Sequence, residues 1–330
     1  MSARDADPID VVVAWVDGSD PAHAAKRAGT EGLSSHSEAS LPTRFAAGPE
    51  LSWCIASVLA NAPYVRRIHV VTDEQIPPQI DAFERAGLTE PGRIRVVDHA
   101  EIFEGTGARL PTFNSLTIEA AIHRVPGLAE RFVYFNDDFF LNRPLGPEAF
   151  FDVEGRPVLH GEWAPPDRRR PKIILRKLLR RLRGSRNMRP SYRVAHELGA
   201  ALAGMDGDFL LQQHFPHPMR RSTIEAFHAE RPEVLPAQGA HRYRHRDQYL
   251  PASLANHLEI ARHGARPSGS VGSFAYYKPG RRFDLDAFCE DVARGRSDFG
   301  CIQSLDEATP DERARIERVM RGKLAAHLPG

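Results

Sequence analysis

The sequence predicts an α/β fold with a mostly parallel, Rossmann-like sheet, helices on both of its faces, and a C-terminal part of helices and loops. Two observations lead to this prediction. Short runs rich in β-branched residues alternate with segments of helical periodicity through the first half of the chain. The β-rich runs are also apolar almost throughout, as is typical of parallel strands covered on both faces.

The predicted elements follow one another in a βαβαβαβ order. The first strand is predicted at residues 9–16 (IDVVVAWV), where nearly every side chain is apolar. The pattern then predicts a helix at 51–60, a strand at 67–72, a helix at 78–86, a strand at 93–98, a helix at 114–124 and a strand at 131–136. Because strands joined through helices lie parallel, their carboxyl ends share one edge of the sheet. A last amphipathic helix is predicted with Pro310 near its start.

Composition indicates a soluble globular protein. The chain has 330 residues, of which 42% are hydrophobic and 26% charged, enough for one large α/β domain or two smaller ones. A net charge of +1 provides no overall field for nucleic acid or membrane. The acidic N-terminus lacks the apolar core of a secretory signal, and the three cysteines form no CxxC pair. We therefore expect a cytoplasmic protein.

Acidic residues follow each of the four predicted strands. They are Asp17, Asp73, Asp98 and the pair Asp137–Asp138. Each alone has an ordinary structural explanation, since DGSDP suits a turn and Asp73 or Asp98 suits a helix cap. Together at one edge, where ligands bind in open α/β sheets, they favour a site for a divalent cation and a polar ligand. Oxygen ligands favour Mg²⁺ or Mn²⁺ over zinc.

Several common site motifs are absent from the sequence. No GxxxxGK[ST] or GxGxxG follows a predicted strand, so the sequence supports neither a P-loop NTPase nor a dinucleotide oxidoreductase. No HExxH occurs either. His214 and His217 are three residues apart, but Pro216 between them argues against a zinc pair on a helix.

A basic segment interrupts the chain between residues 165 and 193. Ile174, Leu178 and Leu182 fall on one helical face, with arginine and lysine over much of the rest. One interpretation is a solvated helix with a narrow apolar stripe. The other is a basic amphipathic helix on an anionic membrane face or acceptor. We expect an exposed helix at 168–193 bordering the cleft, and no nucleic-acid binding, because no aromatic platform accompanies the charge.

Five stretches resemble the four conserved blocks of the Stealth family. This family comprises bacterial capsular polysaccharide phosphotransferases and is related to the catalytic subunit of animal N-acetylglucosamine-1-phosphotransferase. The first two blocks are resembled by IDVVVAWVDGSDP, YVRRIHVVTDEQIP and LPTFNSLTIEAAIHRVPGLAERFVYFNDDFF, the third by QHFPHPMRRS through HRYRHRDQYLPASLANHL, and the fourth by DFGCIQSLDEATPDERARIERVM. The resemblance implies a nucleotide-sugar-binding α/β part at 1–160, a basic insertion at 161–200, and a C-terminal part at 201–330 that completes the active site.

The resemblance implies transfer of a sugar-1-phosphate from a nucleotide sugar to a hydroxyl of an acceptor glycan, on a fold like the nucleotide-sugar transferases. Asp137 and Asp138 would hold Mg²⁺ or Mn²⁺ at the donor diphosphate. Asp17 and Asp73 would help to position the donor or the metal. Asn136 would orient the sugar phosphate.

The resemblance extends to phosphate-binding and acid–base residues. Asn114 and Ser115 would begin a helix whose amides suit a phosphate. His217 matches the histidine of the third block and is the predicted general base, with a pKa near neutral, although a turn residue between two prolines explains it equally well without the family. The same block contains Arg220, Arg242 and Asp247. The resemblance implies that the two arginines bind phosphate oxygens. It also implies that Asp247 orients one of these arginines or contacts the acceptor.

The sequence also departs from the family pattern. Ser52 and Ala56 stand where the family commonly has arginine, Gln303-Ser304 stand where it has Asn-Asp, and HRYRHRDQY has a shorter arginine-to-aspartate spacing. If the Asn-Asp pair contributes to the metal site, binding here depends more on Asp137 and Asp138. Two alternatives therefore stay open. One is a metal-dependent glycosyltransferase that releases a nucleoside diphosphate, and the other is a non-catalytic glycan-binding relative.

Overall fold

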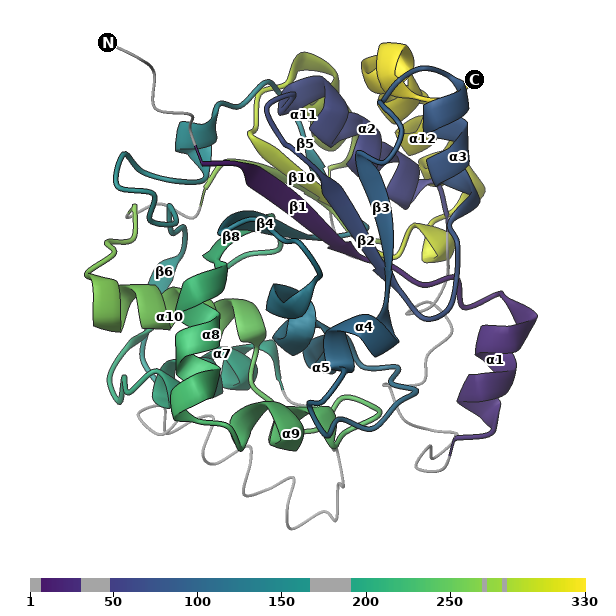
Figure 1. Ribbon diagram of the computed structural model, residues 1–330. Helices are drawn as coiled ribbons and strands as arrows, with labels where there is room; N and C mark the ends of the chain where they lie inside the picture. The colour runs from purple at the N-terminus through teal and green to yellow at the C-terminus, as the bar shows by residue number, and fades with distance from the viewer. Residues whose placement is uncertain (1–6, 31–47, 167–190, 269–271, 281–283) are drawn as a thin grey trace.

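The computed structural model describes residues 7–30, 48–166, 191–268, 272–280 and 284–330. They form a central sheet with strand order β3-β2-β1-β4-β8. The strands are β1 (Ile9–Ala14), β2 (Ile68–Thr72), β3 (Ile94–Asp98), β4 (Arg131–Asn136) and β8 (His217–Arg220). The first four run parallel, and β8 pairs antiparallel with β4 at one edge. The predicted α/β class with a mostly parallel sheet is confirmed (Figure 1).

Both faces of this sheet are buried, which explains the apolar composition of its strands. Along β1, Val11 and Val13 belong to one hydrophobic cluster and Val12 to the other, because successive side chains of a strand point to opposite faces. In β4, Val133 and Phe135 follow the first cluster, and Phe132 and Tyr134 follow the second. Helices are therefore needed on both sides of the sheet.

One face is covered by four helices and a second sheet. The helices are α2 (Glu50–Asn61), α3 (Pro78–Arg85), α11 (Leu285–Arg294) and α12 (Pro310–Leu324). In Figure 1 they lie above the central sheet, and their apolar side chains share its first cluster. The second sheet has the order β5-β10-β9, with β5 (Phe139–Leu141), β9 (Phe274–Tyr277) and β10 (Phe299–Ile302).

The other face is covered by the remaining longer helices. They are α4 (His99–Phe103), α5 (Ser115–Ala121) with the short helix η3 (Ile122–Arg124), α7 (Tyr192–Leu202), α8 (Arg221–Glu230), α9 (Val234–Gly239) and α10 (Pro251–His263). These lie below the sheet in Figure 1. Helix α1 (Pro21–Ala28) stands apart at one side, and β6 (Glu162–Ala164) pairs with β7 (Phe209–Leu211). The helices η4 (Pro147–Ala149), η6 (Leu305–Glu307) and η7 (Ala325–His327) are single turns.

Within the second sheet, β5 and β10 make a close approach that only glycine permits. Strand β5 follows β4 after two residues, and its Phe140 pairs with Gly300 of β10. A Cβ atom added at Gly300 would lie 2.0 Å from Cζ of Phe140, far inside van der Waals contact. The aromatic ring therefore packs directly on the backbone of β10. This contact fixes the connection between β4 and β5, which carries Asp137 and Asp138.

Some elements differ from the sequence-based expectations. The first strand ends at Ala14, and the helix expected at 114–124 is regular only to Ala121. Helix α1 was not predicted, although Asp20 accepts a hydrogen bond from the backbone N–H of Ala22, at 2.9 Å, and Pro21 begins the helix, both ordinary start signals.

The C-terminal part of the chain contributes strands to both the central and the second sheet. Residues 201–330 contribute β8 to the central sheet and strands β9 and β10 to the second one. Of the helix predicted at 168–193, only the last three residues lie in the described part, and α7 begins there at Tyr192. Within the described ranges, no helix combines the length and apolar character that a membrane crossing requires.

Candidate active site

A cavity of about 1000 Å³ opens at the carboxyl ends of the parallel strands. Its walls come from the end of β1, the β4–β5 connection, helices α4, α5, α7 and α10, the segment before β8, and residues 302–307. Segments far apart in the sequence meet here because all the parallel strands end at this edge. The prediction that Asp137 and Asp138 line the main cleft is confirmed.

Asp137 and Asp138 form the two-residue connection between the central sheet and the second sheet. The carbonyl of Asp138 accepts a hydrogen bond from the Ile302 N–H at 2.9 Å, and its Oδ2 lies 3.6 Å from the Cys301 Sγ. Burial raises the pKa of both carboxyls above its usual range. The charge of Asp138 adds to the rise at Asp137, and that of Glu50 adds to the rise at Asp138. Two adjacent half-buried carboxylates without a cation are thus electrostatically unfavourable.

Glu50, at the start of α2, is a third acidic group in the same wall. Burial raises its pKa to about 7, with a smaller contribution from the charge of Asp137. Among the described residues, Glu50 Oε2 and Asp138 Oδ1 are buried oxygens without a hydrogen-bond donor. These features fit a divalent cation. No trio of His, Cys, Asp or Glu in the described ranges is arranged to hold a metal alone, so substrate and water oxygens would complete the coordination.

A second polar cluster, which the sequence analysis missed in part, lines the cavity beside the first. Ser115 and Glu119 lie one helical turn apart on α5, and Arg244 Nη2 donates a hydrogen bond to Ser115 Oγ. Tyr134 Oη donates to Asn136 Oδ1 at 2.7 Å. Burial raises the pKa of Glu119 to about 7, although the positive charge of Arg244 and hydrogen bonds with Ser115 and Tyr134 oppose the rise. The cluster places one acid and one cation on the cavity wall.

Two features of the sequence point to Glu119 and Arg244. Glu119 is the only charged residue of the apolar stretch LTIEAA, and an acid within such a stretch of helix needs a partner or a function. Arg244 stands two residues after Arg242, the arginine that the sequence analysis preferred.

His217 also lines the cavity, as the first residue of β8 opposite Tyr134 of β4. Its Nδ1 lies 3.2 Å from Gln212 Nε2. Burial lowers the pKa of the imidazole to about 3, and the neighbouring His196 and His214 lower it further. The side chain is therefore neutral at physiological pH, as a base must be. The expected near-neutral pKa is corrected, because burial lowers the pKa and, among the described residues, no carboxylate contributes an opposing rise.

Arg220 does not reach the cavity. Strand β8 runs antiparallel to β4. His217 pairs with Tyr134 beside the cavity, and three residues later Arg220 pairs with Arg131 at the opposite end of β4. Its guanidinium donates to the carboxylate of Glu259 through Nε at 3.0 Å and Nη2 at 2.6 Å. Glu259 is 1% exposed, so this ion pair stabilises the packing of β8 on α10. The predicted contact of Arg220 with phosphate is therefore wrong for this structure.

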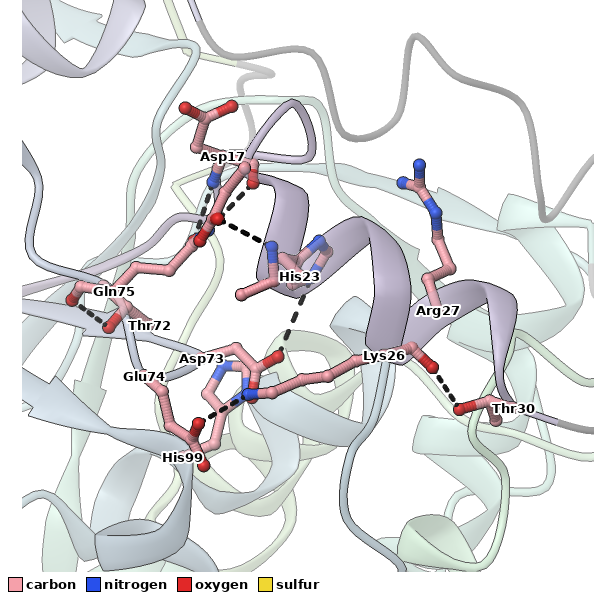
Figure 2. Close-up of polar contacts among 12 residues, drawn as sticks. Asp17, His23, Lys26, Arg27, Thr30, Thr72, Asp73, Glu74, Gln75 and His99 are labelled. Carbon is pink, nitrogen blue, oxygen red and sulfur yellow. Dashed lines mark hydrogen bonds and ion pairs between the residues drawn. The ribbon is translucent and has the colours of Figure 1, made fainter.

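Asp17 and Asp73 lie at the expected edge of the sheet, but neither lines the cavity. The carboxylate of Asp17 accepts hydrogen bonds from the N–H and Oγ of Ser19, at 2.8 and 2.6 Å, and its backbone pairs with the Gln75 side chain. Asp73 is buried beside Lys26 of α1 and two histidines, as Figure 2 shows. Both aspartates order the loops behind the cavity wall.

Three further predicted residues also lie outside the cavity lining. Asn114 is fully buried, caps α5, and donates to His241 O at 2.9 Å and Gln248 Oε1 at 2.8 Å. Arg242 donates to the carbonyl of Leu110 at 3.1 Å. Asp247 has a side chain that is 69% exposed and faces its own neighbours in sequence. Asn114 and Arg242 thus connect residues 110–114, just before α5, with residues 241–248.

Of the predicted site residues, Ser115, Asn136, Asp137, Asp138 and His217 line the cavity. The substituted pair Gln303-Ser304 does so too, and Gln303 Oε1 accepts a hydrogen bond from Tyr276 Oη. Ala56, by contrast, is fully buried within α2. The departure at Ala56 therefore affects packing, while that at Gln303-Ser304 affects the cavity wall.

Comparison with known proteins identifies two family regions in this chain. Residues 7–35 match the model of Stealth protein CR1, conserved region 1, and residues 44–159 match that of Stealth protein CR2, conserved region 2. An exopolysaccharide phosphotransferase of Streptomyces coelicolor is 35% identical over 266 residues, which are 80% of this chain and 45% of that protein. The capsular polysaccharide phosphotransferase LcbA of Aeromonas hydrophila is 34% identical over 227 residues, 66% of this chain and 56% of that protein.

The chain thus spans about half the length of these curated relatives. Among solved structures, the apo form of the bifunctional glycosyltransferase WbbM aligns with 96% of this chain and 53% of that chain. The TM-score is 0.47 and the sequence identity 10%, a likeness too distant to bear on activity.

Proposed function

Because this chain belongs to the Stealth family, we propose that it transfers a sugar-1-phosphate from a nucleotide sugar to a hydroxyl of an acceptor glycan, in the synthesis of a phosphodiester-linked capsular or other surface polysaccharide. The observation that carries the proposal is the pair Asp137–Asp138. Both side chains line a large cavity at the carboxyl ends of the parallel strands, with raised pKa values and a buried oxygen that lacks a donor.

In this proposal Asp137 and Asp138 hold Mg²⁺ or Mn²⁺, with Glu50 nearby. The bound ion would neutralise charge on the donor diphosphate and on the leaving phosphate. The two carboxylates then take part as anions, so donor binding weakens as falling pH protonates them. Arg244, on the wall beside Ser115, supplies a fixed positive charge for phosphate oxygens.

The reaction needs one base and one leaving group. The acceptor hydroxyl oxygen attacks the phosphorus that bears the sugar, and the bond from that phosphorus to the nucleoside phosphate breaks. A nucleoside monophosphate leaves, and the hydroxyl proton passes to a base of the protein. His217 is neutral and lines the cavity, and Glu119 has a pKa of about 7, so both satisfy the requirement for a proton acceptor. The higher proton affinity of Glu119 favours it as the base before substrate binds.

The Gln303-Ser304 pair motivates two competing functions. With fewer acidic groups than the family pattern, the same cavity suits a glycosyltransferase, in which attack on the anomeric carbon releases a nucleoside diphosphate. It also suits a non-catalytic glycan-binding relative. The retained carboxylates Asp137 and Asp138, whose raised pKa values oppose folding unless a cation binds, count against the non-catalytic function.

The test is incubation with a panel of nucleotide sugars, an acceptor glycan and Mg²⁺ or Mn²⁺, with the released nucleotide separated by chromatography. The proposal predicts a nucleoside monophosphate that requires both metal and acceptor and disappears in Asp138→Asn. Release of the diphosphate would support the glycosyltransferase, and no turnover with any donor would support the binding protein. Asp247→Asn, an exposed carboxylate outside the cavity, is the matched control and should retain activity.

We further propose a cytoplasmic protein that contacts the inner face of the membrane through its basic segment. The support is the local excess of arginine and lysine between residues 168 and 193 in a chain of net charge +1. Each such residue near an anionic surface contributes on the order of 1 kcal/mol. Sedimentation with anionic and neutral liposomes tests this, with Arg176, Arg180 and Arg183 changed to glutamate. Equal partitioning of both proteins would contradict membrane contact.

A further inference from the structure

A second part of the cavity is formed by α1, by the start of α4 directly after β3, and by the segment before α5. His99, Thr112, Phe113 and His23 line it, and we name these four residues the distal subsite. His99 and Thr112 are each 1% exposed. Within the described ranges, neither ring nitrogen of His99 nor Oγ1 of Thr112 has a hydrogen-bond partner. Because His99 and Thr112 line the cavity, these three atoms are available to hydrogen-bond a polar ligand.

The charge around His99 is balanced. Asp73 lies 3.9 Å from His99 Nδ1, 3.8 Å from His23 Nε2 and 3.5 Å from Lys26 Nζ. Figure 2 shows these side chains together. Lys26 also bonds to Glu74 at 2.8 Å. Burial lowers the pKa of His99 to about 4, so its ring is neutral at physiological pH and offers one N–H donor and one nitrogen acceptor. The lysine charge is already neutralised, so the distal subsite does not favour a phosphate.

The remaining wall of the distal subsite is aromatic. Phe113 stacks on Tyr243, with ring centroids 5.5 Å apart and an interplanar angle of 23°. His23 contacts the same phenyl ring in a T-shaped arrangement, with ring centroids 5.3 Å apart and an interplanar angle of 78°. Two neighbours therefore fix the plane of Phe113. A flat wall combined with a donor, an acceptor and a hydroxyl is suited to a planar heterocycle whose edge carries both donors and acceptors.

The distance to the carboxylates agrees with this chemistry. His99 directly follows β3, and Asp137 directly follows β4, three strands away in the order β3-β2-β1-β4. Three interstrand spacings amount to about 14 Å. A ribose and a diphosphate span a gap of this size between a base and the anomeric end of a nucleotide sugar.

From this arrangement we infer that the distal subsite binds the base of the donor nucleotide, with His99 and Thr112 hydrogen-bonding its edge and Phe113 against its face. The inference rests on the proposed function for the presence of a nucleotide donor. It assigns ligand contacts to residues that the metal and acid–base chemistry do not use. Asp73 lies within 4 Å of both histidines but does not line the cavity.

Binding measurements by calorimetry, with Mn²⁺ present, test the inference. The probes are UDP, CDP, GDP and ADP, with inorganic pyrophosphate as the probe that lacks a base. For the wild type we expect at least one nucleoside diphosphate to bind 10-fold or more tightly than pyrophosphate. Thr112→Val, which keeps the shape and removes the hydroxyl, should weaken that nucleotide about 10-fold without changing the pyrophosphate Kd. His99→Phe should do the same, and Thr112→Ser should retain the wild-type ratio.

The outcomes separate this inference from the proposed reaction. Equal affinity for all four nucleotides and pyrophosphate would overturn the distal subsite, as would an unchanged ratio in a folded Thr112→Val protein. Asp138→Asn should weaken nucleotide and pyrophosphate alike, because it acts at the diphosphate end. If the nucleotide preference depends on Thr112 while the reaction releases a nucleoside diphosphate, the phosphotransfer is refuted and the distal subsite stands. Circular dichroism melting of each variant verifies the fold.

Discussion

Replacing Asp138 with asparagine should make the metal-free protein more stable while abolishing its activity. The reason lies in the raised pKa of the carboxyl, from 3.8 to about 7, which burial causes and the Glu50 charge increases. Between these two values the folded protein holds a proton that the unfolded chain has released. Stability is therefore lost as pH rises from about 4 to about 7, and the loss stays constant above pH 7.

The magnitude follows from the shift. Three pKa units at about 1.4 kcal/mol each set an upper limit of about 4 kcal/mol on the penalty at pH 8. An amide at this position keeps one atom without a partner, since Asp138 Oδ1 has none in the described residues, and this offsets part of the gain. We expect Asp138→Asn to raise the free energy of unfolding at pH 8 by about 2 kcal/mol, and to change it little at pH 4.

Urea unfolding followed by tryptophan fluorescence, with a chelator present, measures this difference at each pH. Added Mn²⁺ should reverse the order, because an ion at 100 times its Kd stabilises a protein that binds it by about 2.7 kcal/mol. Asp247→Asn, at an exposed position, is the control and should match the wild type throughout. A variant that is less stable than the wild type at pH 8, or that Mn²⁺ stabilises equally, would refute the cation site at Asp138.

Three further substitutions test individual parts of the structure. Glu119→Gln should lower kcat by about 10²-fold or more without lowering the melting temperature, since it removes a buried proton acceptor whose charged form burial disfavours. Near-normal turnover in a pH-rate profile would exclude that role. Arg220→Ala should cost about 3 to 5 kcal/mol of stability, because it leaves Glu259 buried without its ion-pair partner. The folded fraction should keep its nucleotide affinity. A loss of nucleotide affinity in a stably folded variant would instead place Arg220 in the binding site. Gly300→Val should destabilise the fold by about 3 kcal/mol or more in urea titrations, since its Cβ would overlap Phe140. An unchanged midpoint would contradict the close packing of Phe140 on β10 within the second sheet.

Local sequence patterns were sufficient to predict the four parallel strands of the central sheet. Strand β4 has the predicted bounds, and β2 and β3 each begin within one residue of the prediction, because burial on both faces leaves an almost continuous apolar signal. Strand β8 carries no such signal. It has four residues, includes Pro218, and pairs at an edge, where proline is tolerated. Its position depends on the long-range contact with β4, which the local pattern does not encode.

The difference between a local pattern and a long-range contact also explains which site residues were predicted correctly. Asp137 and Asp138 directly follow a strand, so the sheet topology alone places them at the cavity. His217 and Arg220 are three residues apart in one block, but an antiparallel strand carries them to opposite ends of the sheet. Arg242 and Arg244 differ by two residues, and only the second reaches the cavity. The spacing of a motif therefore identified the segment that reaches the site, but only the folded structure shows which of its side chains line the cavity.

The fate of the distal phosphorus of the donor tests the central claim most directly. A nucleotide sugar labelled with ³²P at the phosphate that bears the sugar is incubated with the protein, Mn²⁺ and an acceptor glycan, and glycan and nucleotide are then separated. Transfer of a sugar-1-phosphate predicts that the label appears in the glycan as a phosphodiester, in equal amount to the unlabelled nucleoside monophosphate released. Label that remains with a released nucleoside diphosphate, beside an unlabelled glycosylated product, would contradict the proposed reaction.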